Sequence, residues 1–435
     1  MTDGSLFDRT LRLLARAACV LVFLHVLGWV LVVTKLGGAS TLYVPPIQAA
    51  IGLGLSLLVV RVAGARRGVR RTVAVSVLIV TAVAFLTVPL PVRFVDNTLM
   101  VDGIERVEDR DLFERRFPLA DGQINFHSHL GDIAIISLDR FFGASETSQQ
   151  QAFNALSHLA GLLFLVELLL VGMLYRWSRR VCRYIGLAIG TPMASLYFGY
   201  WELGYIAVAV AVVPFLLFPP NRRGVSTQAS AMAAGALQGL HTALHGFGIL
   251  GMAGGALLAL RAETFARGAL RSLAFTSMAV ALYLGWIFFY VMQFGWQIIY
   301  VRSFDSRQLL TSSIAAGRSV APLLSLDGWA QVSMIGLLAG VPLLALALVR
   351  NSSRATVSVG LFALPGLLFL LRWWPAIFPM NWDLLMVMLP GVWAACWALS
   401  ASRARSYAAV LVCVAMHFLL WSSVGNMWFY SELVE

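Results

Sequence analysis

Charged residues are scarce in this sequence. Only 12% of its 435 residues are Asp, Glu, Lys or Arg, whereas a soluble globular domain carries about 25%. Hydrophobic residues make up 59%, and the mean hydropathy is +0.80. This composition argues against a soluble globular protein, a disordered chain and a collagen-like fibre. Long apolar runs recur from one end to the other and predict an all-α polytopic membrane protein.

Cysteines are few, and nucleotide-binding motifs are missing. The four cysteines, Cys19, Cys182, Cys396 and Cys413, form no CxxC pair and lie in or beside apolar runs. They therefore indicate no disulfide framework and no metal or redox centre. The sequence has no P-loop and no GxGxxG element after a strand, so nothing in it indicates cytosolic nucleotide chemistry.

The apolar runs predict about 13 transmembrane helices, with a range of 11–13. A span needs about 20 apolar residues. The candidate spans are residues 15–34, 43–63, 72–92, 156–175, 184–199, 204–219, 230–244, 246–260, 272–293, 328–349, 356–371, 380–399 and 407–424. The short runs between residues 184 and 260 can be paired in more than one way, so the span count depends on them.

The basic residues indicate an orientation. Every one of them except Lys35 is an arginine, and the net charge is +11. The arginines collect in short clusters between apolar runs, at residues 61–71, 176–183, 222–223, 261–271, 350–354 and 403–405. All of these clusters fall on the cytoplasmic side if the N-terminus is cytoplasmic, as the positive-inside rule describes. The pattern predicts membrane lipid as a partner and argues against nucleic-acid binding.

The predicted outer side divides the chain into three parts. Residues 1–92 form an N-terminal three-span segment, and residues 93–155 form a large extracytoplasmic loop of the catalytic type. Residues 156–435 form a multi-span helical core with a second outer loop at 294–327. The first loop holds 11 of the 21 acidic residues. A loop this long between helices is seldom only a connector.

Asp96 stands apart from the other acids of this loop. It follows the end of the third predicted span by about four residues, at the membrane surface. An unpaired charge is most costly there, and partial desolvation makes a carboxylate a better general base. Asp102 begins the charge run that follows. Most acids of that run alternate with arginines at helical spacing, which is typical of a solvated surface.

A short amphipathic helix is predicted in the outer interface after this charge run. Apolar residues recur at helical spacing over 130–142. His127, His129 and Asp132 lie at its start. H-x-H with a carboxylate is a partial metal-ligand set, but no third strong ligand is near, so no metal is predicted. Capping of the helix start and orientation of a substrate hydroxyl or phosphate remain open for these three residues.

Five polar residues interrupt the apolar background further along the chain. Glu202 lies at a turn between aromatic residues and either faces water or lines a cavity. His241 and His245 are four residues apart on one helical face, where they form either a structural hydrogen-bonded pair or part of a site. Arg372 and Asp383 bracket a Pro-containing outer turn. They fit either a salt bridge or, for Arg372, contact with an anionic head group.

Two short motifs add a family resemblance. Phe198 to Glu202 read Phe-Gly-Tyr-Trp-Glu, and Asn381 to Leu384 read Asn-Trp-Asp-Leu at a predicted span start. With the acidic outer loop, these motifs resemble the GT-C superfamily of integral membrane glycosyltransferases, in particular its uncharacterised bacterial branch of polyprenyl-phosphate-sugar-dependent enzymes. Asn381 departs from the aspartate usual in that branch. The acidic loop also follows the third predicted span, whereas GT-C enzymes carry it after the first.

The resemblance implies a reaction. A sugar would pass from a polyprenyl-phosphate-linked donor to an acceptor on the extracytoplasmic face of the bacterial inner (plasma) membrane, with inversion at the anomeric carbon. An outer-loop carboxylate would serve as base, which makes Asp96 the candidate, with Asp102 and His129 as alternates. The family's usual lack of a metal agrees with the missing ligand set, so no cofactor is expected.

The leaving phosphate would need cationic donors, for which arginine has the better geometry. The outer-side arginines outside the first loop are Arg302, Arg307, Arg318 and Arg372. The full set predicted to bind substrate is His127, Asp132, Glu202, His241, His245, Arg302, Arg307, Arg372 and Asp383.

Three other functions fit parts of the sequence. A transporter or lipid flippase would use central polar residues and helices broken at Pro192, Pro214 or the Gly-rich stretch 246–255. A non-catalytic subunit of a membrane complex would tolerate neutral replacement of Asp96 and the arginines. An outer-facing acyltransferase or phosphotransferase would rely more on the histidines. Fold-level analogy alone does not decide among them.

Overall fold

The protein was analysed as a computed structural model of residues 1–435. The structure describes residues 9–18, 20–21, 44–86, 141, 146–191, 208–217, 227–244, 248–261, 264–294, 340–350, 353–377 and 388–432. Within these residues the chain forms helices and turns and no β-strand.

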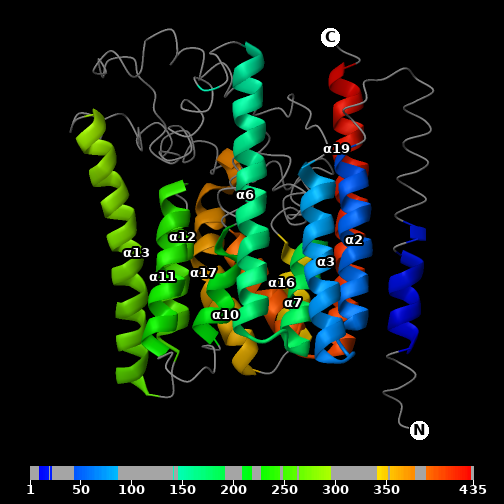
Figure 1. The fold of residues 1–435 in the computed structure, drawn as a ribbon, viewed down its shortest axis with the longest axis horizontal. Coiled ribbons are helices and arrows are strands. Elements are labelled where there is room, and N and C mark those ends of the chain that lie inside the picture. The colour runs from blue at the N-terminus through cyan, green and yellow to red at the C-terminus, as the bar shows by residue number, and fades with distance from the viewer. Residues whose placement is uncertain are drawn as a thin grey trace.

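Thirteen helical elements are bounded in the described ranges. In chain order they are α2 (Val44–Val62), α3 (Arg67–Leu86), α6 (Glu146–Leu174), α7 (Arg179–Gly190), η3 (Val208–Ala211), α10 (Val212–Leu217), α11 (Thr227–Leu244), α12 (Gly248–Ala259), α13 (Phe265–Phe294), α16 (Val341–Arg350), α17 (Ser353–Ile377), α18 (Leu389–Leu399) and α19 (Arg403–Glu432). The long helices lie side by side with their axes in one direction (Figure 1). Helix α13 lies at one edge, α2, α3 and α19 lie toward the other, and α6 lies between them (Figure 1).

The prediction of about 13 membrane-spanning helices is wrong for the part of the chain that the structure describes. Only one helix there, Phe265–Phe289 within α13, is long and apolar enough to cross a membrane by length and composition. Several predicted spans contain shorter helices: 204–219 holds η3 and α10, of four and six residues, and 380–399 holds α18, of 11 residues. A helix of 11 residues is about 16 Å long, whereas the hydrocarbon core of a bilayer is about 30 Å thick. The helical class agrees with the sequence, and the number of spans does not.

Glycines let several of these helices approach closely. Gly235 and Gly239 lie one turn apart on α11, where α13 packs against them. A Cβ at Gly235 would collide with the backbone carbonyl of Phe275, and a Cβ at Gly239 would collide with that of Ala279. Two small residues at this spacing allow backbone contact between helices. On the other side of the bundle, Gly190 of α7 leaves room in the same way for Ser56 of α2.

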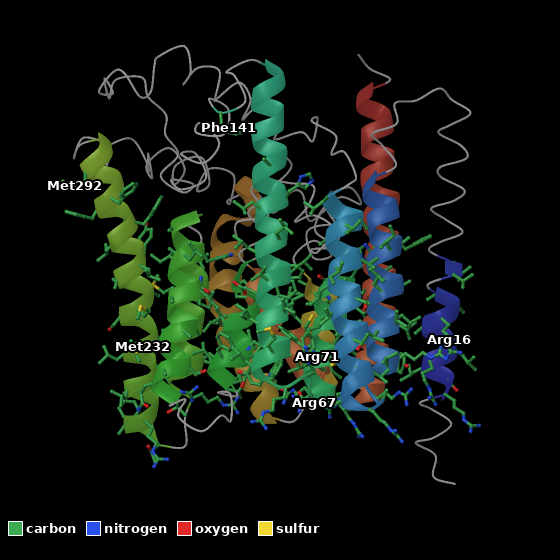
Figure 2. All side chains as sticks on the ribbon, in the orientation of Figure 1. Arg16, Arg67, Arg71, Phe141, Met232 and Met292 are labelled. Atoms are coloured by element: carbon green, nitrogen blue, oxygen red, sulfur yellow. The ribbon has the colours of Figure 1, made fainter. Side chains whose placement is uncertain are left out.

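Short turns join consecutive helices at one end of the bundle, which we call the turn end. The turns after α2, α6 and α18 span residues 63–66, 175–178 and 400–402. Arginines concentrate there: Arg67 begins α3, Arg179 begins α7 and Arg403 begins α19. Arg67 and Arg71 are labelled at this lower end of the bundle in Figure 2.

Some of these arginines bind carbonyls at the ends of other helices. Arg183 of α7 donates from Nε to the Ser400 carbonyl, at 2.7 Å, and from NH2 to the Ala401 carbonyl, at 3.0 Å. Arg180 donates to the Trp397 carbonyl, at 3.1 Å, and stacks its guanidinium 4.5 Å from the centre of the Trp397 ring. The last carbonyls of a helix have no partner within the helix, and cations are favoured at that end. Two arginines of α7 therefore cap the C-terminal end of α18.

The turn after α6 has a strained backbone, and contacts with α6 and α3 stabilise it. Arg176 and Trp177 have φ values of 54° and 53°, in the left-handed region that non-glycine residues seldom occupy. The buried Trp177 ring lies against Gly172, and its carbonyl accepts a hydrogen bond from Arg70 Nε of α3, at 3.1 Å. These contacts offset the strain and fix the direction in which α7 leaves α6.

The caps on α18 make a testable prediction. We expect Arg183→Gln to lower the free energy of unfolding by about 1–3 kcal/mol, because two carbonyls lose charged donors. Arg179→Gln is the matched control: it removes an exposed arginine one turn earlier on α7 that has no hydrogen-bond partner among the described residues. Thermal unfolding of the full-length protein in detergent measures both variants. Equal shifts in Tm would show that loss of charge, and not loss of the caps, is responsible.

Candidate functional site

A short helix of ten residues lies buried in the middle of the bundle. It consists of η3 followed directly by α10, and the residues Val210 to Leu216 are all buried. Pro214 falls in the first turn of α10, where a missing backbone N–H costs little. A helix this short has few internal hydrogen bonds, so most of its backbone polar groups need partners from outside.

Three side chains bind the carbonyls at the end of α10. Tyr175 Oη donates to the Pro214 carbonyl, at 2.7 Å, and Ser230 Oγ donates to the Phe215 carbonyl, at 2.8 Å. Arg271 of α13 donates to the Leu216 carbonyl. Three of the last four carbonyls of α10 are therefore capped by residues from the α6–α7 turn, α11 and α13.

Two further side chains hold the beginning of the same helix. The Tyr184 hydroxyl of α7 donates to the Val210 carbonyl, at 2.6 Å. Glu167 of α6 accepts a hydrogen bond from the Ala211 backbone N–H on its Oε2, at 2.8 Å. The short helix is thus fixed by polar contacts to α6, α7, α11 and α13, and its position is set by side chains at least as much as by apolar packing.

Glu167 is the site residue that the sequence analysis missed. Its side chain is only 3% exposed, and its Oε1 has no hydrogen-bond partner in the part of the chain that the structure describes. It is also the only carboxylate side chain that the structure describes. The sequence contained a signal, because Glu167 interrupts an otherwise apolar run from Leu162 to Val171, and a buried acid in such a run usually has a function.

The upper part of α11 carries a second polar group. Gln238 donates from Nε2 to the Gly248 carbonyl, at 2.8 Å, and Thr242 Oγ1 donates to the Gln238 carbonyl, at 2.8 Å. His241 is only 1% exposed, and neither of its ring nitrogens has a hydrogen-bond partner among the described residues. Gln238 Oε1 is likewise unpaired. Buried polar atoms without partners are uncommon in folded proteins, and each calls for an explanation such as a ligand.

The register between α10 and α11 places His241 relative to the short helix. Ser230 contacts Phe215, and α11 runs in the opposite direction to α10. His241 lies three turns, or about 16 Å, along α11 from Ser230, on nearly the same face. Val208 lies about 12 Å from Phe215 in the same direction. Measured along the bundle from the Ser230–Phe215 contact, His241 therefore lies about one helical turn farther than Val208, the first residue of η3.

Helix α18 is the second short helix of this region. All of its residues are buried, and it packs against α10, α7, α16 and α17. Its Trp397 ring lies 6.1 Å from the Tyr175 ring and 5.1 Å from the Tyr184 ring, both in edge-on geometry. These two tyrosines also bind the backbone of η3 and α10. The aromatic contacts thus connect the two short helices through shared residues.

Both short helices end toward the turn end of the bundle. The α18 end is capped by Arg180 and Arg183 of the turn end, and the α10 end by Arg271, near the start of α13. With 10 and 11 residues they are of equal length, about 16 Å. The first residues of the two helices consequently lie at a similar distance from the turn end. His241 lies at about the same distance.

Most site residues predicted from the sequence lie outside the described residues. These are Asp96, Asp102, His127, His129, Asp132, Glu202, His245, Arg302, Arg307, Arg318 and Asp383. Arg372 lies within α17, where the backbone is described and its side chain is not. His241 lies on α11, and its side chain is described and buried. Among the described residues no group of three or more His, Cys, Asp or Glu side chains is placed to hold a metal ion.

Comparison with protein-family models, with curated proteins and with solved structures finds no match for this chain. The resemblance to the GT-C superfamily therefore stays a prediction from short motifs. A function for this chain is therefore inferred from the chemistry and positions of its own residues.

Glu167 offers a test of this site. We expect Glu167→Gln to leave the free energy of unfolding nearly unchanged, because the amide oxygen still accepts the hydrogen bond of the Ala211 N–H. Glu167→Leu leaves that buried N–H unpaired and should cost about 1–3 kcal/mol. Thermal unfolding of the two full-length variants in the same detergent compares them. Equal destabilisation by Gln and Leu would show that the bond to Ala211 does not hold the short helix.

Proposed function

We propose that the protein is a membrane-bound glycosyltransferase. It transfers a sugar from a polyprenyl-phosphate-linked donor to an acceptor on the extracytoplasmic face of the bacterial inner membrane. The reaction inverts the anomeric carbon, and Asp96 is the base. Membrane lipid and the lipid-linked donor are the partners, and no cofactor is required.

One observation supports this proposal above others: the two motifs precede the two short helices. Glu202 lies six residues before Val208, where η3 begins (202 to 208), and Asp383 lies six residues before Leu389, where α18 begins (383 to 389). Six residues reach at most about 21 Å. The proposal assigns both acids to one site together with His241.

This grouping suits a sugar phosphate. Carboxylates and imidazole bind sugar hydroxyls through hydrogen bonds, and a buried site makes such bonds stronger. His241 has two unpaired ring nitrogens, so it has hydrogen-bonding capacity to spare for a ligand. The proposal assigns the leaving phosphate to Arg372, together with Arg302 and Arg307, because charge develops there in the transition state.

The experiment is a turnover assay on the full-length protein. Purified protein is incubated with synthetic polyprenyl-phosphate sugars in mixed micelles, with bacterial membrane extract as the source of acceptor. Release of polyprenyl phosphate measures turnover for any acceptor. We expect Asp96→Asn to lower the rate at least about a hundredfold, as loss of a general base does. Asp109→Asn, within the solvated charge run of the same loop, should leave the rate unchanged.

Three outcomes would contradict parts of the proposal. Full activity of Asp96→Asn would remove Asp96 as the base and leave Asp102 and His129 as candidates. Loss of activity with a chelator would bring back His127 and His129 as metal ligands. Absence of turnover with every donor offered would argue against glycosyl transfer.

Transport is the second candidate, because one observation also favours it. Helices that start in the middle of a bundle, next to a buried ionisable group such as Glu167, are typical of transporters. The same purified protein in proteoliposomes distinguishes the two. Movement of a lipid-linked sugar across the bilayer without its consumption would favour transport.

A further inference from the structure

Most arginines of the turn end belong to one of two groups. Those of the first group donate hydrogen bonds to helix ends or turns, as Arg70, Arg180, Arg183 and Arg271 do. Those of the second group are exposed, and their side chains make no hydrogen bond to the described residues. They are Arg61, Arg66, Arg67, Arg71, Arg176 and Arg179. The first group stabilises the fold, and the second group has no such role.

No carboxylate among the described side chains balances the charge of the second group. Glu167 is the only carboxylate side chain in the described residues, and it is buried and bound to the Ala211 backbone. Like charges close together repel one another unless counter-ions are recruited. Within the described part of the chain, no carboxylate is placed to balance the exposed arginines, and an anion of another molecule can do so.

An exposed apolar face lies next to these charges. On α3, which begins with Arg67, the side chain of Val69 is 50% exposed, and those of Ile79 and Val83 are 57% and 56% exposed. Leu58 on the neighbouring α2 is 43% exposed. A hairpin with exposed arginines at its turn and exposed apolar side chains along its length matches a molecule with an anionic head and an apolar tail. A nucleic acid would match only the charges.

We propose that the α2–α3 hairpin binds anionic phospholipid. Arg66, Arg67 and Arg71 bind the phosphate of the head group, and the exposed face of α3 lies along the acyl chains. A guanidinium contacts two phosphate oxygens at once, which favours arginine over lysine for geometry, although both carry the charge. This surface contains no residue assigned to glycosyl transfer, and it does not depend on that function.

The experiment measures lipid binding by the delipidated full-length protein in a neutral detergent. Isothermal titration calorimetry with short-chain phosphatidylglycerol gives the Kd, and phosphatidylcholine with the same chains is the uncharged control. Glycerol phosphate and inorganic phosphate test for a site that binds a free anion. A duplex DNA oligonucleotide tests for a general polyanion site.

We expect phosphatidylglycerol to bind at least about tenfold more tightly than phosphatidylcholine, and to weaken with added salt. The triple variant Arg66→Gln, Arg67→Gln, Arg71→Gln should reduce its affinity to that of phosphatidylcholine. The matched Arg66→Lys, Arg67→Lys, Arg71→Lys variant should retain most of the binding, because the charge remains. Thermal unfolding of both variants should match the wild type, since these arginines cap no helix.

Several results would overturn the proposal. Wild-type affinity in the triple Gln variant would show that these arginines do not bind the lipid. Equal affinity for glycerol phosphate or inorganic phosphate would indicate a site for a free anion, and tighter binding of DNA would indicate a polyanion surface. Turnover in the glycosyl-transfer assay is read separately, so failure of one proposal leaves the other unaffected.

Discussion

Each short helix buried in this bundle needs partners for the backbone groups at its ends, and that requirement determines which helices pack together. Helix α10 is capped by Tyr175, Ser230 and Arg271. Helix α18 is capped by Arg180 and Arg183. Unpaired buried carbonyls cost free energy comparable to a lost hydrogen bond. Neither short helix is therefore a stable unit alone, and each depends on side chains from helices distant in the sequence.

The same requirement creates the place where function is proposed. A helix that ends at the turn end and extends for about 16 Å must begin inside the bundle. Backbone and side-chain polar groups in an apolar interior are tolerated only where partners or a ligand satisfy them. Glu167, Gln238 and His241 all retain unpaired polar atoms in this region. These unpaired atoms thus supply hydrogen-bonding capacity for a substrate beside the short helices.

The sequence predicted some of this arrangement and missed the rest for definable reasons. Recurrent apolar runs correctly predicted helices, and arginine clusters correctly marked several helix ends, as at Arg67, Arg179 and Arg403. Hydropathy marked residues 204–219 and 380–399 as one span each, because it measures apolar character and not helix length; the bounded helices there have 4, 6 and 11 residues. Glu167 was missed because its neighbours are so apolar that the whole run fitted the interior of a span. His241 was predicted as a candidate because two histidines on one helical face are rare in such a sequence, and its role in a site stays a prediction.

The arginines show most clearly what a sequence leaves undetermined. Arg179 and Arg183 are one turn apart on α7, in the same cluster and with the same flanking charges. Arg183 binds two carbonyls of the turn after α18, whereas Arg179 is exposed. Burial, together with the nearby Arg183, also lowers the pKa of Arg180 to about 10, while its contacts with the Trp397 carbonyl and ring keep it in place. One cluster of arginines therefore contains residues with two roles: some stabilise the fold, and others are exposed and can bind an anion. The two kinds are distinguished by whether the structure places a carbonyl within hydrogen-bond distance of the side chain.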